Sequence, residues 1–198
     1  MTDEARALWD AEAERFDDAA DHGLHDPRTR QAWADLLLPV IGGRERRVAD
    51  LGCGTGTLSH LFASEGGHFV TGVDFSSEMI RRAREKNDGA IPKPTFIVAD
   101  AARPPLSAGS FDVVLCRHVL WAMPAHAAAL HSWIELLTPT GVLILIEGRW
   151  QTGVGLTADE CAKLVRDQRS DVQLSVLDDP SYWGGPTSDE RYLIVSRR

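Results

Sequence analysis

The hydrophobic and polar positions follow different patterns in the first and later parts of the chain. Leu8, Trp9, Ala13 and Phe16 recur at helical spacing, which predicts an amphipathic helix at the start. Residues 17–26 form a polar stretch with two histidines, and we expect a loop there. No strand pattern precedes about residue 45.

A second helix is predicted to begin at Asp26 and Pro27, because Asp is a favoured N-cap and Pro a favoured first helical residue. Gly42 and Gly43 are expected to end it. Its apolar face consists of Trp33, Leu36, Leu37, Val40 and Ile41. The two helices make up a predicted N-terminal helical cap, residues 1–44.

From residue 45 to residue 198, short apolar runs alternate with amphipathic segments, one of them capped by Ser76. Continuous apolar runs are typical of parallel strands that are buried on both faces. The alternation predicts an α/β, doubly wound sheet with right-handed crossovers. The predicted strands are residues 47–51, 68–74, 95–100, 111–116 and 141–147.

The last segment departs from this alternation. After a helix from about Thr157, two further strand patterns occupy residues 172–177 and 191–196. The loop between them is too short for a normal crossover helix, so an antiparallel hairpin at the sheet edge is expected. The prediction is a single domain with a seven-stranded, mostly parallel sheet in a core at residues 45–198.

The composition of the chain limits the kinds of binding partner and the cellular compartment that we expect. The chain has 21 Lys and Arg against 29 Asp and Glu, a net charge of -8. Nucleic-acid binding is therefore not expected, because it needs clustered positive charge. The start lacks a signal-peptide pattern, and no apolar run reaches the roughly 18 residues of a membrane span. We expect a cytoplasmic monomer or homodimer without membrane contact.

The three cysteines, Cys53, Cys116 and Cys161, have no CxxC spacing. This pattern argues against a disulfide framework and against structural zinc, and no metal site is expected.

A glycine-rich segment follows the first predicted strand. DLGCGTG at residues 50–56 contains Gly52, Gly54 and Gly56, and Asp74 ends the second predicted strand 22 residues after Gly52. Ligands bind at the carboxyl ends of strands in such sheets, and a carboxylate there accepts hydrogen bonds from a ribose diol. Thr57 stands where the dinucleotide fingerprint GxGxxG has its third glycine, which counts against NAD.

The motifs resemble, in order, those of the class I S-adenosylmethionine-dependent methyltransferases, in particular the type 11 methyltransferase group. VADLGCGTG resembles the first motif, VTGVDFSSEMI the second-strand motif and FIVADA the third, while PPLSAGSFDVVLCRHVLW and GVLILIEG resemble the fourth and fifth strand regions. The resemblance covers about residues 45–198, with weaker similarity in the cap. It implies a Rossmann-like methyltransferase fold, S-adenosyl-L-methionine as cofactor and S-adenosyl-L-homocysteine as product.

The resemblance also implies a cofactor site. Its expected members are Asp50, Gly52, Cys53 and Gly54 for the methionine and ribose part; Asp74 for the ribose hydroxyls; Phe75, Met79, Asp100 and Ala101 for the adenine; Arg117 near the methionine moiety; and Phe16 and Arg30 from the cap, Arg30 facing the cofactor carboxylate. Phe16 stands where relatives often have Tyr, so a hydroxyl contact is lost here.

Methyl transfer mainly needs alignment of the nucleophile, and a base only when a proton must leave. His118, after the fourth strand, is the candidate base or acceptor contact, with an imidazole pKa near 6.5; the alternative is a packed pocket wall. His22 is a second candidate or a loop residue. Glu147 is expected to bind a cationic substrate or to form a structural ion pair. Trp121, Met123 and Trp150 are expected to wall the acceptor pocket or to lie in the core.

The short connection after the fifth strand, about residues 148–171, leaves no room for a large substrate domain. We therefore expect an O, N or S nucleophile of a small molecule as methyl acceptor. Two alternatives stay open from sequence: a nonenzymatic S-adenosylmethionine-binding module, and an NAD-dependent oxidoreductase on the same fold.

Overall fold

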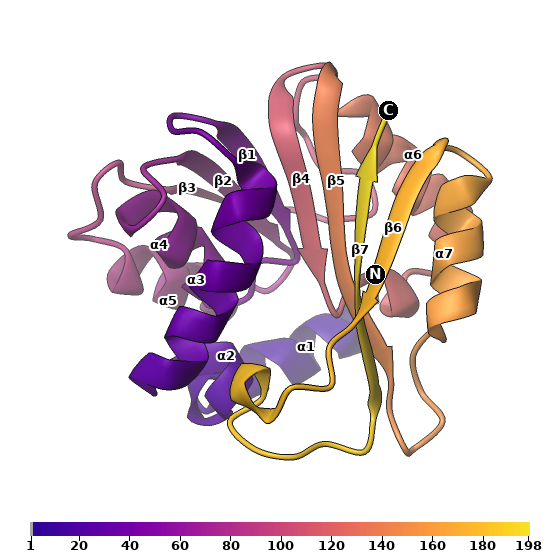
Figure 1. Cartoon of the computed structure of the whole chain (residues 1–198). Coiled ribbons are helices and arrows are strands. Elements are labelled where there is room, and N and C mark those ends of the chain that lie inside the picture. The colour runs from indigo at the N-terminus through magenta and orange to yellow at the C-terminus, as the bar shows by residue number, and fades with distance from the viewer. Residues whose placement is uncertain (1) are drawn as a thin grey trace.

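The computed structural model describes residues 2–198, and within this range seven strands form one sheet (Figure 1). The strands are β1 (Arg47–Leu51), β2 (Phe69–Asp74), β3 (Thr95–Val98), β4 (Phe111–Arg117), β5 (Leu137–Arg149), β6 (Asp171–Val176) and β7 (Glu190–Arg197). Their order is β3-β2-β1-β4-β5-β7-β6. The first five are parallel, and β7 is antiparallel to β5 and β6. The predicted fold class, including the antiparallel pair, is confirmed.

Helices connect most of the strands. They are α1 (Asp3–Glu12), α2 (Ala20–Gly23), α3 (Pro27–Ile41), α4 (Thr57–Ser64), α5 (Ser77–Lys86), α6 (His126–Glu135) and α7 (Ala158–Arg166), with short 3-10 turns η1 (Phe16–Asp18), η2 (Leu120–Ala122) and η3 (Pro180–Tyr182). The predicted N-caps are confirmed, since Asp26 and Ser76 each accept a backbone N–H of the first helical turn. Thr157 and Glu160 form a reciprocal capping box.

Two predictions for the start of the chain are wrong in detail. The first helix ends at Glu12, so Phe16 lies in the turn η1 and not on the helix. The expected loop at residues 17–26 contains part of η1 and all of α2. The polar composition of this stretch hid its short helical turns, which are held by tertiary contacts described below.

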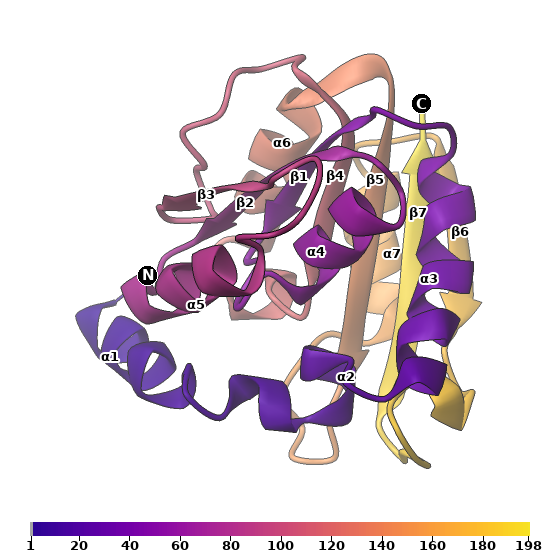
Figure 2. The same ribbon diagram turned by 90° about the vertical axis from the view of Figure 1, so that its left-hand side faces the viewer.

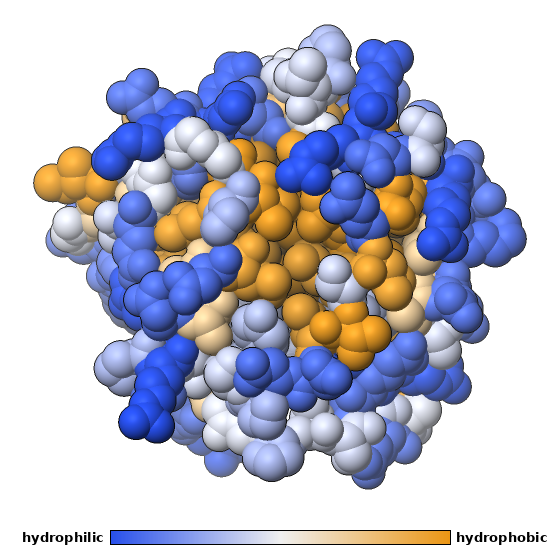
Figure 3. Space-filling model, viewed as in Figure 1, coloured by the Kyte–Doolittle hydropathy of each residue, from blue (hydrophilic) through white to orange (hydrophobic). Residues whose placement is uncertain are grey.

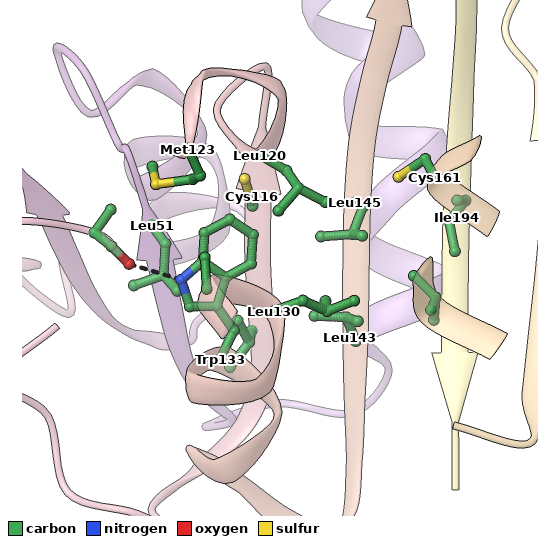
Figure 4. Packing of buried hydrophobic residues seen from close by; sticks show 14 of the residues in the cluster. Leu51, Cys116, Leu120, Met123, Leu130, Trp133, Leu143, Leu145, Cys161 and Ile194 are labelled. Carbon is green, nitrogen blue, oxygen red and sulfur yellow. Dashed lines mark hydrogen bonds between the residues drawn. The ribbon is translucent and has the colours of Figure 1, made fainter. Parts of the chain in front are cut away.

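The helices cover both faces of the sheet, as Figures 1 and 2 show together. Alternation along β5 explains this: Ile144 and Ile146 pack with α3 and α4, while Leu143 and Leu145 pack with α6 and α7. Trp133 of α6 is fully buried and donates its ring N–H to the carbonyl of Ala101 at 2.6 Å (Figure 4). This packing fixes the carboxyl ends of the central strands in space.

The segment before α3 lies across the site rather than on the sheet. α1 runs beside α5 (Figure 2), where Asp10 accepts hydrogen bonds from the Ser76 hydroxyl and the Glu78 backbone. α3, in contrast, buries Trp33 and Leu37 against the sheet. Residues 2–24 therefore form the actual cover of the strand ends, while α3 belongs to the layers of the core.

Apolar side chains also show in the middle of the face seen in Figure 1, between α3 and β6 (Figure 3). Leu174 and Val176 of β6 are the exposed apolar residues on this edge strand.

Candidate cofactor and acceptor site

A cavity of about 410 Å³ lies at the carboxyl ends of β1, β2 and β4. The strand register explains why these ends meet, because Leu51 of β1 is paired with both Val73 and Cys116. Most of the predicted cofactor residues line this cavity: Phe16, Asp50, Gly52, Cys53, Gly54, Asp74, Phe75, Met79, Ala101 and Arg117. The predicted acceptor residues His22, His118, Trp121, Met123 and Trp150 line the same cavity. Its volume is in the range of small-ligand sites.

The turn after β1 needs glycine for conformation and for space. Gly52 and Gly54 have φ values of 71° and 52°, which L side chains rarely adopt. A Cβ on Gly54 would come within 3.1 Å of the Phe16 ring, and one on Gly52 would collide with the Val119 side chain. The turn therefore presents bare backbone to the cavity, as a closely bound nucleoside cofactor requires.

Asp74 anchors this turn. Its carboxylate accepts the backbone N–H groups of Gly54 and Ser76, each at 2.9 Å, and its side chain is nearly buried. Burial raises the pKa of Asp74, and these two hydrogen bonds oppose the rise. Because a carboxylate offers further lone pairs, Asp74 can hold the turn and still accept from a ribose hydroxyl.

Asp50 lies deeper, under the glycine turn. It accepts the Ser59 hydroxyl at 2.6 Å. Burial raises the pKa of Asp50 to about 6, opposed by the Ser59 hydrogen bond and by the positive charge of Arg117. The Asp50 carboxyl at the cavity floor thus changes between its neutral and its charged form at about pH 6.

Arg117 ties the cover to the sheet. Its Nη1 donates to the backbone carbonyl of Asp21 in α2 at 2.5 Å, and its guanidinium lies 5.5 Å from the centre of the Trp33 ring. Burial lowers the pKa of Arg117, whereas the nearby carboxylates of Asp21, Asp50 and Asp17 support its charge.

The cover contributes a stack of rings. Phe16 is parallel to His22 with 4.2 Å between ring centres, and Trp9 meets the edge of Phe16 at 6.1 Å. Burial lowers the pKa of His22, so its ring favours the neutral form.

His118 has an unusual environment. Its φ of 57° turns the chain just after β4, and its backbone N–H donates to the backbone carbonyl of Ile146 at 2.8 Å. The ring stacks on Trp183 at 6.0 Å and meets Trp150 edge-on at 5.4 Å. Burial, followed by the charges of Arg117 and Arg191, holds the pKa of His118 well below 6.5. A neutral imidazole of such low basicity is a weak general base at neutral pH.

The structure places Glu147 beneath the cavity rather than in its lining. The fully buried carboxylate accepts the N–H groups of Val119 and Leu120 at 3.0 and 2.7 Å, and burial raises its pKa to about 8. It therefore holds the turn that presents His118, and the expected contact with a cationic substrate does not fit this position.

Two further predicted residues lie away from the cavity lining. Arg30 points from α3 toward α4 and donates to Glu65 at 2.6 Å, because it lies on the face of α3 beside the end of α4. Asp100 accepts the backbone N–H of Ala102 at 2.9 Å. The side chains of Arg30 and Asp100 therefore do not line the cavity beside the glycine turn.

Six residues of the lining were not predicted from the sequence: Trp9, Asp21, Leu58, Val119, Ala122 and Arg191. Arg191 of β7 lies between the rings of Trp150 and Trp183, at 4.7 and 5.1 Å from their centres, and pairs with Asp189 at 2.8 Å. Trp9 carried a signal in its helical spacing with Phe16, but Asp21 and Arg191 carried none, since no local motif marks them.

Comparisons with known proteins agree with this geometry. Residues 48–141 match the family model described as a methyltransferase domain. A trans-aconitate 2-methyltransferase of Rhodopseudomonas palustris (strain BisB18) is 38% identical over 141 residues, which cover 69% of this chain and 49% of that protein. A ubiquinone/menaquinone biosynthesis C-methyltransferase of Methylococcus capsulatus is 31% identical over 150 residues, covering 72% and 58%. The chain spans about half the length of such curated relatives.

Solved structures show the same fold. The cyclase SpnF superposes with a TM-score of 0.74 at 17% identity, over 84% of this chain and 80% of that one. A magnesium protoporphyrin IX methyltransferase from Synechocystis PCC 6803, solved with bound S-adenosylmethionine, superposes with a TM-score of 0.66 at 23% identity, over 86% and 80%.

The sheet order, the glycine turn and the acidic end of β2 define a Rossmann-like fold built for a nucleoside cofactor. Together with the matches, they support a class I S-adenosylmethionine-dependent methyltransferase, and residues 48–141 match the methyltransferase domain itself. S-adenosylmethionine is the cofactor of this family, and the bare glycine backbone with Asp74 beside it fits that molecule. Among residues 2–198, no helix is both long and apolar enough to cross a bilayer.

Proposed function

We propose that the chain transfers a methyl group from S-adenosylmethionine to an O, N or S nucleophile of a small molecule. One observation carries the proposal: a single cavity joins the glycine turn and Asp74 to a compartment walled by Trp121, Trp150 and His118. Cofactor and acceptor would therefore lie in one shared cavity, whose walls would set their alignment.

In the cofactor half, the chain's residues bind and orient. Asp74 would accept the ribose hydroxyls while it keeps Gly54 in place. Phe75 and Met79 would pack on the adenine, and Arg117 would face the methionine carboxylate. The bound cofactor supplies a methyl group that its sulfonium already activates, so these residues need only fix its direction.

In the acceptor half, the residues position the nucleophile. Trp121 and Trp150 meet at 5.5 Å and offer flat apolar walls, and the Trp121 ring N–H is occupied by the His118 carbonyl at 2.9 Å. Arg117 and Arg191 both line the cavity, which favours an acceptor with a negative group. The relatives named for trans-aconitate and for quinone biosynthesis also support a small acceptor.

Two measurements test the proposal. Calorimetry with S-adenosylmethionine, S-adenosylhomocysteine and NAD tests the cofactor half. A screen with methyl-labelled cofactor and small carboxylic acids, phenols and amines tests transfer, and labelled product is the expected result. Binding of S-adenosylhomocysteine without transfer to any acceptor class would favour the alternative of a nonenzymatic binding module.

A further inference from the structure

Three metal-ligating side chains converge at the inner wall of the cover. Asp21 and His22 come from α2, and His118 comes from the turn after β4, 96 residues later in the chain. One ligand atom of each lies within 4.8 Å of those of the other two. All three residues line the cavity. The cluster thus lies where the cover meets the sheet, beside the hydrogen bond from Arg117 to the backbone carbonyl of Asp21.

The spacing is close to that of a bound ion. Metal–ligand distances of about 2.0–2.2 Å place neighbouring ligand atoms roughly 3–3.5 Å apart. His22 Nε2 and Asp21 Oδ2 are already 3.6 Å apart. The ligand atom of His118 lies within 4.8 Å of both of these groups.

His118 supplies the second observation. Its Nε2 is buried, although the residue as a whole is only partly so, and it has no hydrogen-bond partner within residues 2–198. A buried polar atom without a partner costs about 1–3 kcal/mol and asks for an explanation. A metal ion between His118, His22 and Asp21 would satisfy it.

Two arginines lie nearby. Carboxylates of Asp17, Asp21 and Asp50 support the charge of Arg117, and Arg191 pairs with Asp189. Both guanidiniums still add positive charge around His118, so a bound ion would depend on the Asp21 carboxylate for its nearest negative charge.

We propose that Asp21, His22 and His118 form a binding site for a divalent transition-metal ion of the zinc, cobalt or iron(II) type. Two imidazoles and one carboxylate are borderline ligands that suit these ions better than magnesium or calcium. Three protein ligands leave coordination positions open toward the cavity. An oxygen of the acceptor would occupy one of them, and the ion would also tie α2 to the end of β4.

The test uses the whole chain after treatment with a chelator. Co²⁺ is titrated by calorimetry and by visible absorption, in the presence of S-adenosylhomocysteine. We expect one Co²⁺ per chain, displaced by Zn²⁺. Asp21→Asn and His22→Ala should each weaken binding at least about a hundredfold, since even the loss of an outer contact costs ten- to a hundredfold. His118→Asn, which tolerates the positive φ, should do the same.

His25→Ala is the matched control, because His25 is exposed and lies three residues from His22. It should bind Co²⁺ like the wild type. An unchanged far-UV circular dichroism spectrum in every variant would show that the fold is intact. Binding of S-adenosylhomocysteine by the wild type reports on the proposed function separately. The site is overturned if the wild type binds no stoichiometric Co²⁺, or if the three ligand variants bind it as the wild type does.

Discussion

At the scale of single residues, Asp74 combines a structural and a binding task. Its carboxylate satisfies the N–H groups of Gly54 and Ser76, and it faces the cavity at the end of β2. The loss of this side chain would free two backbone donors in a nearly buried place, so the turn itself would loosen.

Asp74→Ala should therefore weaken S-adenosylhomocysteine binding about ten- to a hundredfold, or ~1.5–3 kcal/mol. It should also lower the unfolding temperature. From the sequence, no such loss of stability is expected, because Asp74 lies at the end of a strand and not in the core. Calorimetry and thermal unfolding measure the two effects. Asp88→Ala, at an exposed residue, is the control and should change neither. Unchanged affinity in Asp74→Ala would mean that the residue only supports the turn.

His118 illustrates how the environment changes a group's chemistry. From sequence, its imidazole is expected to titrate near pH 6.5 and is a candidate base or acceptor contact, with a packed pocket wall as the alternative. In the structure, burial comes first, and Arg117, Arg191 and His22 add positive charge around it, so its pKa is well below 6.5. Asp21, in the same cluster, is the carboxylate nearby.

NMR of the imidazole in labelled, metal-free protein tests this directly. The His118 resonance should titrate with a midpoint below 6.5, because protonation would place a charge in a buried and positively charged place. A His118→Asn sample assigns the signal. A midpoint at or above 6.5 would contradict the environment described here and would restore the ring as an efficient base near neutral pH.

At the scale of elements, the cover is held by polar contacts at its inner side. Lys86 at the end of α5 pairs with Asp17 at 2.7 Å, and it also donates to the hydroxyls of Thr55 and Thr57 at 2.9 and 2.6 Å. These contacts join η1, the glycine turn and α4. Lids over such pockets often open and close to admit ligand. Opening of this cover would have to break the contacts of Lys86.

Lys86→Met should increase hydrogen exchange in residues 9–23 and weaken cofactor binding several-fold, because it removes three partners while keeping the length of the side chain. Lys93→Met is the control, since Lys93 pairs only with the exposed Asp88 among the contacts seen. Bound S-adenosylhomocysteine should slow exchange in the same segment of the wild type. Equal protection with and without ligand would indicate a rigid cover and another entry route.

Glu147 links β5 to the turn that follows β4. Its pKa is raised by burial from an ordinary 4.5 to about 8. A carboxyl whose folded pKa is raised binds its proton more tightly in the folded state. Its contribution to stability is therefore complete below about pH 4.5 and is lost as pH rises through about 8.

Glu147→Gln cannot titrate at this position. Its free energy of unfolding relative to the wild type should therefore rise between pH 6 and pH 9, measured by denaturant unfolding at both pH values. Glu135→Gln, at an exposed residue of α6, controls for the general effect of charge. A difference between the wild type and Glu147→Gln that stays constant with pH would mean that Glu147 is already ionised at pH 6.

At the scale of the whole molecule, local patterns and the family resemblance predicted the layers and most of the residues that line the site. Continuous apolar runs gave the parallel strands, caps gave the helix starts, and Gly52, Gly54 and Asp74 follow strand ends that must meet at one edge. The remaining features depend on distant pairings. β7 lies between β5 and β6, and this position brings Arg191 against the ring of Trp150. The contact between α2 and β4 is the hydrogen bond from Arg117 to the Asp21 carbonyl, which forms only once the cover has folded over the sheet. Arg30 lies on a predicted helix, but the spacing of its residues did not predict that the Arg30 side chain would face α4 and pair with Glu65.

The identity of the cofactor is tested most directly by a calorimetric titration of the whole chain with S-adenosylhomocysteine and, separately, with NAD. We expect one S-adenosylhomocysteine per chain with a dissociation constant of about micromolar order, a clear loss of affinity in Asp74→Ala, and no binding of NAD. Absence of S-adenosylhomocysteine binding, or NAD binding of equal strength, would contradict this expectation.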